Sequence, residues 1–134
     1  MHLLINPASP WPVYRQIIDQ IKRDIALGRL VSGDKLPTVR DLAAQLVINP
    51  NTIAKAYRQL EQEGVIHTRP GAGTFVAEID SHLNLEVRRR VLCEQLERVV
   101  VDAVHMQIDA VTLGQWFQEV LSRFQLLQGK ESYE

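Results

Sequence analysis

Cysteine is scarce in this sequence, and long apolar runs are missing. The single cysteine, Cys93, excludes a disulfide within the chain and a zinc site built from several cysteines, so a reducing cytoplasm suits the protein. No stretch approaches the ~20 apolar residues that cross a bilayer, and the first residues lack the basic segment and apolar run of an export signal. We therefore expect a cytoplasmic protein without a membrane partner.

Catalytic and cofactor-binding motifs are also missing. No Gly-rich phosphate loop follows a predicted strand, and no Ser, His and Asp residues form a recognisable catalytic pattern. The histidines lack the spacing of metal ligands; they are His2, His67, His82 and His105. The sequence predicts no enzyme, no metal site and no cofactor.

The nearly balanced charge hides a difference between two parts of the chain. The 134 residues carry a formal net charge of −1. Residues 1–78 hold 9 Lys and Arg against 7 Asp and Glu (+2), whereas residues 79–134 hold 6 against 9 (−3). We expect two domains, residues 1–78 and residues 79–134. The mild positive charge of the first is only a weak sign of nucleic-acid binding.

Three helices are predicted in the first part. Residues 12–30 have the apolar spacing of an amphipathic helix closed by Gly28. A short helix follows Thr38, which forms a capping box with Asp41. After the tight connection "VINP", residues 49–64 predict a third helix with Asn49 as N-cap, Pro50 in its first turn and Gly64 just beyond its end. Two short helices joined by about three residues are typical of a helix-turn-helix.

The pattern then changes from helix to strand. Residues 65–68 and 74–77 are two β-prone runs around "RPGAG", whose proline and glycines favour a turn. A small hairpin that follows a helix-turn-helix makes a winged helix, with Arg69 at the tip of the wing. The predicted fold is therefore mainly α with a small β-hairpin, and a helical tail follows it.

Two amphipathic helices are predicted in the tail. From about residue 83 apolar residues recur at heptad spacing, and a last helix is expected at Thr112, which forms a capping box with Gln115. Two helices in about 55 residues expose more apolar surface than they bury on each other, so we expect a homodimer of helical hairpins. The alternative is that they fold back on the winged helix of their own chain. The expected interface residues are Leu92, Leu96, Val99, Ala103, Trp116, Phe117, Val120 and Phe124.

Four motifs of residues 1–78 resemble the DNA-binding domain of the GntR family of bacterial transcription regulators. They are "YRQI" (14–17), "GDKLPTVRDLA" (33–43), "NPNTIAKAYRQLEQEGVI" (49–66) and "RPGAGTFV" (69–76), in the order and spacing of the family. A short two-helix tail in place of a large effector domain is similar to the YtrA subfamily. The resemblance implies that residues 49–64 form a recognition helix for the DNA major groove.

The resemblance also implies a set of DNA-contacting residues. Asn51, Thr52 and Lys55 have the chemistry to contact base edges, because Asn pairs with adenine, Lys donates to guanine and Thr contacts the thymine methyl or a phosphate. Asn49 has two alternative roles, a phosphate contact or a helix cap alone. The full expected set is Arg40, Asn49, Asn51, Thr52, Lys55, Arg58, Arg69 and Gly71.

Arg40 matches the arginine of the family motif at the start of the second helix, where relatives meet DNA. Arg58 has the alternative of pairing with a nearby glutamate, Glu61 or Glu63. Pro70 stands beside Arg69 where some relatives carry a polar contact residue, and this departure puts base contact by the wing in doubt.

The leading hypothesis is a dimeric repressor that binds an inverted-repeat operator in double-stranded DNA. The resemblance to the YtrA subfamily implies control of its own operon, often beside genes for ABC transporters. One alternative is a winged helix used as a protein-interaction module, with the polar helix face left in solvent. Another is a regulator that responds to a small molecule held between the tail helices by Trp116, Phe117 and Phe124, although these aromatics also suit a simple core.

Overall fold

The fold is taken from a computed structural model, which describes residues 1–78 and 85–124, apart from the side chains of Leu85 and Val87. Contacts divide the chain into two compact units, Met1–Ile79 and Asp80–Glu134. We call them the N-terminal unit and the C-terminal unit, and describe each by itself. No helix in the described ranges is long and apolar enough to span a membrane.

The N-terminal unit contains three helices, α1 (Val13–Ala26), α2 (Val39–Leu46) and α3 (Pro50–Gln62). The Thr38 hydroxyl caps α2 by accepting from the Asp41 N–H at 3.0 Å, and Asn49 caps α3 by accepting from the Asn51 N–H at 2.8 Å. Gly64 follows α3 with a φ of 76°. The predicted start and end of the third helix are therefore confirmed.

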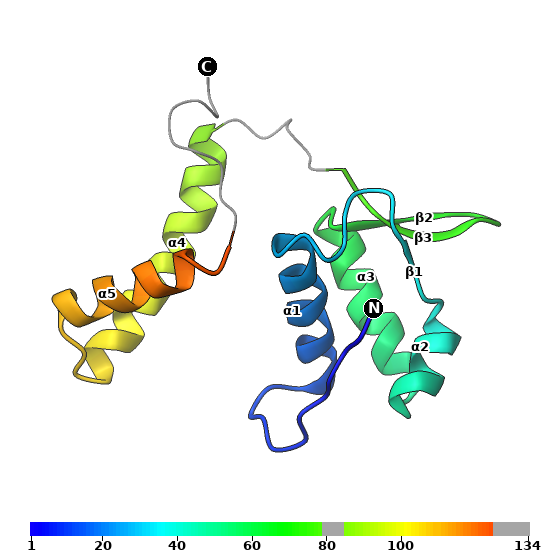
Figure 1. Cartoon of the computed structure of the whole chain (residues 1–134), viewed down its shortest axis with the longest axis horizontal. Helices are drawn as coiled ribbons and strands as arrows, with labels where there is room; N and C mark the ends of the chain where they lie inside the picture. The colour runs from blue at the N-terminus through cyan, green and yellow to red at the C-terminus, as the bar shows by residue number, and fades with distance from the viewer. Residues whose placement is uncertain (79–84, 125–134) are drawn as a thin grey trace. The chain divides into compact units, whose positions relative to one another are not determined.

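The wing is part of a sheet of three short antiparallel strands. The strands are β1 (Lys35–Leu36), β2 (Ile66–Arg69) and β3 (Gly73–Val76), in the order β1-β3-β2 (Figure 1). The hairpin is confirmed, with each strand shifted by one residue from the prediction, so Arg69 pairs with Gly73 as the last residue of β2. Strand β1 was missed because two residues are too few to show a period.

The three helices and the sheet enclose one hydrophobic core. Helix α3 packs against both α1 and α2, and β2 adjoins its C-terminal end (Figure 1). The Tyr57 hydroxyl donates to the Pro37 carbonyl at 2.7 Å, which satisfies a polar group at the edge of this core. Burial raises the pKa of the Tyr57 phenol well above its usual range. The buried residues include Ile17, Ile18, Ile21, Leu36, Leu42, Ala43, Ile53, Ala56, Leu60, Ile66 and Val76.

The C-terminal unit is a pair of helices, α4 (Leu85–His105) and α5 (Ala110–Leu121), joined by a short turn (Figure 1). The predicted start of the last helix at Thr112 is wrong. Asp109 is the N-cap, because its Oδ1 accepts from the Thr112 N–H at 3.0 Å, so Thr112 lies inside the first turn. Phe124 lies beyond the end of α5. His82 lies outside the described residues.

The fold class is confirmed as mainly α with a small hairpin. The two units differ greatly in how much they bury. Among the described residues, every buried hydrophobic side chain lies in the N-terminal unit except Ala103, which is 7% exposed. The N-terminal unit thus has a core of its own, whereas the apolar side chains of α4 and α5 remain largely exposed.

Candidate nucleic-acid interface

The N-terminal half of α3 presents a polar face opposite its buried stripe. Asn51 and Lys55 are exposed and Thr52 is half-buried, while Ile53 and Ala56 on the other side are fully buried. The spacing of 51, 52 and 55 places the three side chains on one face of the helix. Amide, hydroxyl and ammonium groups on one exposed helix face are the donors and acceptors that recognise base edges in the major groove.

Asn49 has a structural role in the cap of α3. Its Oδ1 is occupied by the Asn51 N–H, one of the first helical donors that lack a partner within the helix. Asn49 is also exposed, and its amide N–H₂ takes no part in the cap. The same side chain therefore has room for both roles that the sequence left open.

Lys55 does not extend freely into solvent. Its Nζ lies over the ring of Tyr14 in the first turn of α1, 3.9 Å from the ring centroid. At this distance the ammonium is attracted by the electron-rich face of the ring. Lys55 of the polar face is thus held by a side chain of α1.

Arg40 stands in the first turn of α2, close to the start of α3. It is exposed, and it lines a shallow hollow of about 390 Å³ together with Ile48 and Pro50. The hollow spans the turn between the two helices. The structure therefore brings Arg40 and the N-terminus of α3 to the same side of the helix-turn-helix.

Arg58 is exposed. Its two suggested ion-pair partners, Glu61 and Glu63, bond to other residues. Glu61 accepts from the Thr68 N–H of β2 at 3.1 Å, and Glu63 forms a 2.8 Å ion pair with Lys22 of α1. Both carboxylates instead fasten α3 to its neighbours. The charge of Arg58 stays at the surface, one turn beyond Lys55 along α3.

The wing arginine lies against its own strands. The Arg69 Nε donates to the His67 Nε2 at 3.2 Å, and the guanidinium lies over the Phe75 ring, 5.0 Å from its centroid. Gly71 has a φ of 78° and open space around it, so the turn at the wing tip leaves backbone accessible. Arg69 is exposed.

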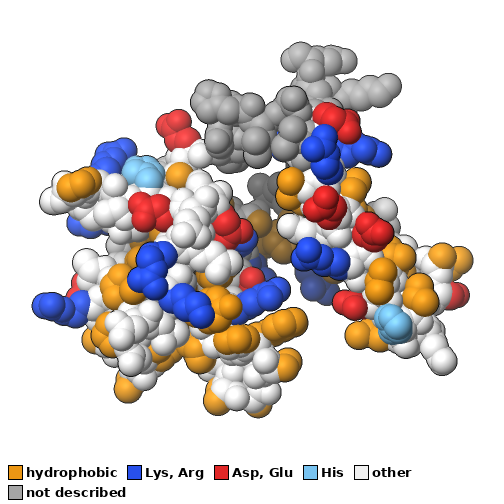
Figure 2. Space-filling view, turned by 180° about the vertical axis from the view of Figure 1, so that it is seen from behind, with side chains coloured by type: hydrophobic (Ala, Val, Ile, Leu, Met, Phe, Trp, Pro, Cys, Tyr) orange, Lys and Arg blue, Asp and Glu red, His pale blue; other side chains and the backbone are white. Residues whose placement is uncertain are grey.

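Positive side chains gather on the N-terminal unit. Figure 2 shows several Lys and Arg side chains across the middle of the visible face of this unit. The basic residues on the polar side come from three elements: α2 supplies Arg40, α3 supplies Lys55 and Arg58, and the wing supplies Arg69. Lys and Arg side chains are the groups that pair with DNA phosphates in nucleic-acid-binding proteins.

The C-terminal unit exposes apolar side chains on both helices. A groove of about 450 Å³ between α4 and α5 is lined by side chains of one kind only, all apolar: Leu96, Val99, Val100, Ala103, Val104, Ile108, Ala110, Leu113 and Phe117, together with Gly114. The expected interface residues Leu92, Leu96, Val99, Trp116, Phe117 and Val120 are all exposed, Phe124 is half-exposed and Ala103 is buried. Apolar side chains lie close together on this unit in Figure 2.

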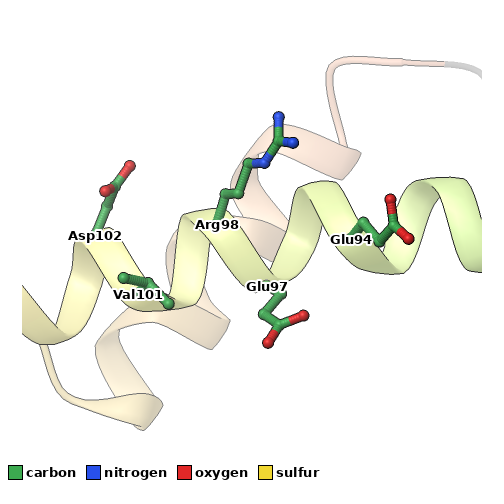
Figure 3. Close-up of a pocket in the computed structure, with 5 residues that line it drawn as sticks. All are labelled: Glu94, Glu97, Arg98, Val101 and Asp102. Atoms are coloured by element: carbon green, nitrogen blue, oxygen red, sulfur yellow. The ribbon is translucent and has the colours of Figure 1, made fainter.

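A different side of α4 is charged. Glu94, Arg98 and Asp102 project from the helix at successive turns, with Glu97 and Val101 beside them (Figure 3). All five residues come from one helix and surround only an open hollow. This face has the composition of a solvated helix surface, in contrast to the groove side. Cys93 is also exposed.

Two features of the interface have no clear sequence signal. The contact between Tyr14 and Lys55 joins residues 41 positions apart, and only the packing of α1 on α3 brings them together. Val47, in the turn of the helix-turn-helix, adopts the left-handed conformation at φ 54° and ψ 52°, where β-branched residues are rare. The left-handed conformation of Val47 could have been predicted only by recognising this residue as the C-terminal cap of α2.

Known proteins resemble this chain over both units. A family model described as "Bacterial regulatory proteins, gntR family" matches residues 13–76. The HTH-type transcriptional repressor YtrA of Bacillus subtilis (strain 168) is 40% identical over 116 residues, which cover 87% of this chain and 89% of YtrA.

Two solved structures add a likeness in three dimensions. A crystal structure of a transcriptional antiterminator from Listeria monocytogenes EGD-e has a TM-score of 0.82 and 29% identity, and covers 96% of this chain and 98% of that one. The domain AraR(DBD), in a crystal structure with operator ORX1, has a TM-score of 0.50 and 34% identity, and covers 56% of this chain and 93% of that one.

Fold, polar helix face and relatives together define a winged-helix, DNA-binding transcription regulator. It is a regulator and not an enzyme. The chain belongs to the GntR family, and within that family to the YtrA subfamily.

Proposed function

We propose that this protein represses transcription as a homodimer that binds an inverted-repeat operator. The observation that carries the proposal is the polar face of α3, where Asn51, Thr52 and Lys55 stand together at the N-terminal half of the helix. In helix-turn-helix proteins this half of the second helix contacts base edges in the major groove. Repression is the activity named for the Bacillus subtilis relative.

Each predicted contact has a separate part in this proposal. Asn51, Thr52 and Lys55 contact base edges, and Arg40 binds a phosphate beside the groove entered by α3. Arg58 and the free N–H₂ of Asn49 add backbone contacts. Arg69 and the open backbone at Gly71 meet the minor groove or its phosphates from the wing.

The C-terminal unit supplies the dimer interface. Its groove is lined only by apolar side chains, and two helices of this size cannot cover those side chains by themselves. A second copy of the same unit offers a matching apolar surface and closes the interface by two-fold symmetry. Two α3 helices related by such an axis fit half-sites about one helical turn apart.

Resemblance to the YtrA subfamily extends the proposal to the regulated genes. We propose that the protein acts in the cytoplasm on its own operon, with ABC transporter genes among the targets. A small-molecule effector held in the α4–α5 groove is the second candidate, because the groove has the volume of a ligand site. The lining offers no polar side chain to orient such a ligand, and this favours a packed interface between subunits.

DNA binding is tested by fluorescence anisotropy with a duplex from the protein's own upstream region and a scrambled duplex, at two salt concentrations. We expect tight binding to the native duplex alone, with a steep loss of affinity as salt rises. Lys55→Ala or Asn51→Ala should cost about 1 to 3 kcal/mol and relax choice at one base position. Equal losses on both duplexes would contradict base contact by α3. If binding survives the loss of Lys55 and Arg40 together, the polar face of α3 is not the DNA contact. This result would favour the alternative, in which the winged helix is a protein-interaction module.

Dimerisation is tested by sedimentation of two matched variants. Val99 and Val101 have nearly the same exposure, 51% and 49%, but Val99 lines the apolar groove and Val101 the charged face of α4. Val99→Glu should convert the dimer to a monomer, because it would bury an unpaired charge. Val101→Glu should leave the dimer intact. If both variants behave alike, the groove is not the interface.

A further inference from the structure

The geometry points to Tyr14 of α1 as a positioning residue for base recognition by Lys55. This inference rests on the proposed function, since it assigns to Tyr14 a part in a contact that Lys55 makes with DNA. The observation is the position of the Lys55 ammonium, 3.9 Å from the centroid of the Tyr14 ring and over its face.

Tyr14 is a firm support for the lysine. It is half-buried and packs against the hydrophobic core of the N-terminal unit, so its ring is fixed by its surroundings. It stands at the second position of α1, a helix that packs on α3 and contains the fully buried Ile17 and Ile21. A lysine on an exposed helix face ordinarily samples many rotamers, and this freedom is lost when it binds. The ring removes part of that cost in advance.

The type of contact also matters. In the described residues, each carboxylate that forms an ion pair pairs with a cation other than Lys55. A carboxylate partner would accept hydrogen bonds from the ammonium and offset its charge. An aromatic face attracts the charge without a lone-pair acceptor, so the N–H donors stay available for guanine O6 and N7. The contact thus orients Lys55 and leaves its recognition chemistry intact.

The contribution of the Tyr14 ring can be separated from that of its hydroxyl by substitution. Tyr14→Phe keeps the ring and removes the hydroxyl, so it should bind DNA like the unmodified protein. Tyr14→Leu keeps an apolar side chain against the core and removes the cation–π contact. Lys22→Leu serves as the matched control, because it removes another α1–α3 contact, the ion pair with Glu63, at the opposite end of α3.

The experiment is a double-mutant cycle with the full-length protein. The probe is a duplex selected by the unmodified protein from a randomised pool, and anisotropy gives Kd for this duplex and for a scrambled one. Tyr14→Leu should weaken binding of the selected duplex about threefold to tenfold and leave the scrambled duplex almost unchanged. In a Lys55→Ala background, the same change should have almost no effect. Tyr14→Phe and Lys22→Leu should match the unmodified protein, and thermal unfolding should show that every variant folds.

Three results would overturn the inference. If the Tyr14→Leu and Lys55→Ala losses multiply, the two residues act independently. If Tyr14→Phe binds as weakly as Tyr14→Leu, the hydroxyl and not the ring is responsible, for example by a phosphate contact. If Lys55→Ala itself leaves the affinity unchanged, the failure lies in the proposed base contact and Tyr14 has nothing to position. The first two results leave the proposed function standing, so the two failures are distinguishable.

Discussion

Val47 is a strained residue whose replacement should stabilise the N-terminal unit. It ends α2 in the left-handed conformation at φ 54°, and its N–H and that of Ile48 satisfy the carbonyls of Ala44 and Ala43. Glycine or asparagine usually occupies such a position because a Cβ crowds the backbone there. The Val47 side chain is 89% exposed, so little packing compensates the strain.

The expected gain follows from three terms. Relief of the left-handed strain contributes about 1 to 2 kcal/mol, because the Cβ of an L-residue crowds the backbone in this conformation. Glycine costs about 0.5 to 1 kcal/mol through the greater freedom of the unfolded chain. Loss of the small buried part of the side chain costs about 0.2 kcal/mol. Val47→Gly should therefore stabilise the unit by about 0.5 kcal/mol, which raises Tm by about 2 to 4 °C in a domain of this size.

The two tryptophans allow this gain to be measured in one unit alone. Trp11 lies in the N-terminal unit under the Arg15 guanidinium, 4.6 Å from the ring centroid, and Trp116 lies on α5. In a Trp116→Phe background, Trp11 fluorescence follows unfolding of the N-terminal unit. Val47→Asn should also stabilise, because Asn tolerates this conformation, and Val47→Ala should gain almost nothing because the Cβ remains. A gain with Ala equal to that with Gly, or a loss with Gly, would refute the strain argument.

Three further predictions test the core, the C-terminal cap and the phosphate contact. Tyr57→Phe should cost about 1 to 3 kcal/mol in urea unfolding, because the Pro37 carbonyl loses its donor, and an unchanged midpoint would show that water replaces the hydroxyl. Hydrogen bonds from the Thr112 hydroxyl and N–H hold the pKa of the Asp109 carboxyl below its usual range, so its stabilisation is complete above about pH 4 and is lost as pH falls through that lowered pKa. Asp109→Asn should keep the cap and remove this acid sensitivity of α5, measured by circular dichroism; an identical acid profile would exclude Asp109 as its source. Arg40→Ala should weaken binding to all duplexes and reduce the salt slope by about one contact, whereas an unchanged slope would exclude a phosphate contact.

The elements of the N-terminal unit could be predicted because their ends carry local signals. Asn49, Pro50 and Gly64 mark the third helix through side-chain and backbone chemistry within a few residues, and the structure confirms each. The hairpin was found from two β-prone runs around a turn. These signals do not depend on the rest of the fold, and so one sequence suffices to find them.

The misplaced start of α5 shows where local signals compete. Thr112 with Gln115 and Asp109 with Thr112 are both plausible N-cap pairs, three residues apart along the same segment. Asp is at least as good a cap as Thr, and the segment between them contains no proline or glycine to prevent the earlier start. The helix therefore begins at Ala110 and gains almost one turn.

The candidate site was predictable as a list of residues and not as an arrangement. The polar face of α3 follows from helical period alone, but the support of Lys55 by Tyr14 and the bond from Arg69 to His67 depend on packing between elements. Arg58 is an opposite case, because an ion pair that the sequence suggested does not form. Glu61 is a suitable partner by its i,i+3 spacing and Glu63 is near in sequence, yet tertiary contacts with Thr68 and Lys22 take both of them.

The uneven burial of the two units links dimerisation to operator binding. The N-terminal unit has a complete core, so it needs no partner to present α3, whereas the apolar groove of the C-terminal unit is satisfied only by a second copy in our proposal. A dimer presents two copies of α3 to one inverted repeat, and the second half-site then binds at a high effective concentration. By thermodynamic reciprocity, the operator must strengthen the dimer by the same factor by which dimerisation strengthens operator binding. Val99→Glu should therefore weaken operator binding without touching any residue of α3, and excess operator should restore part of the dimer.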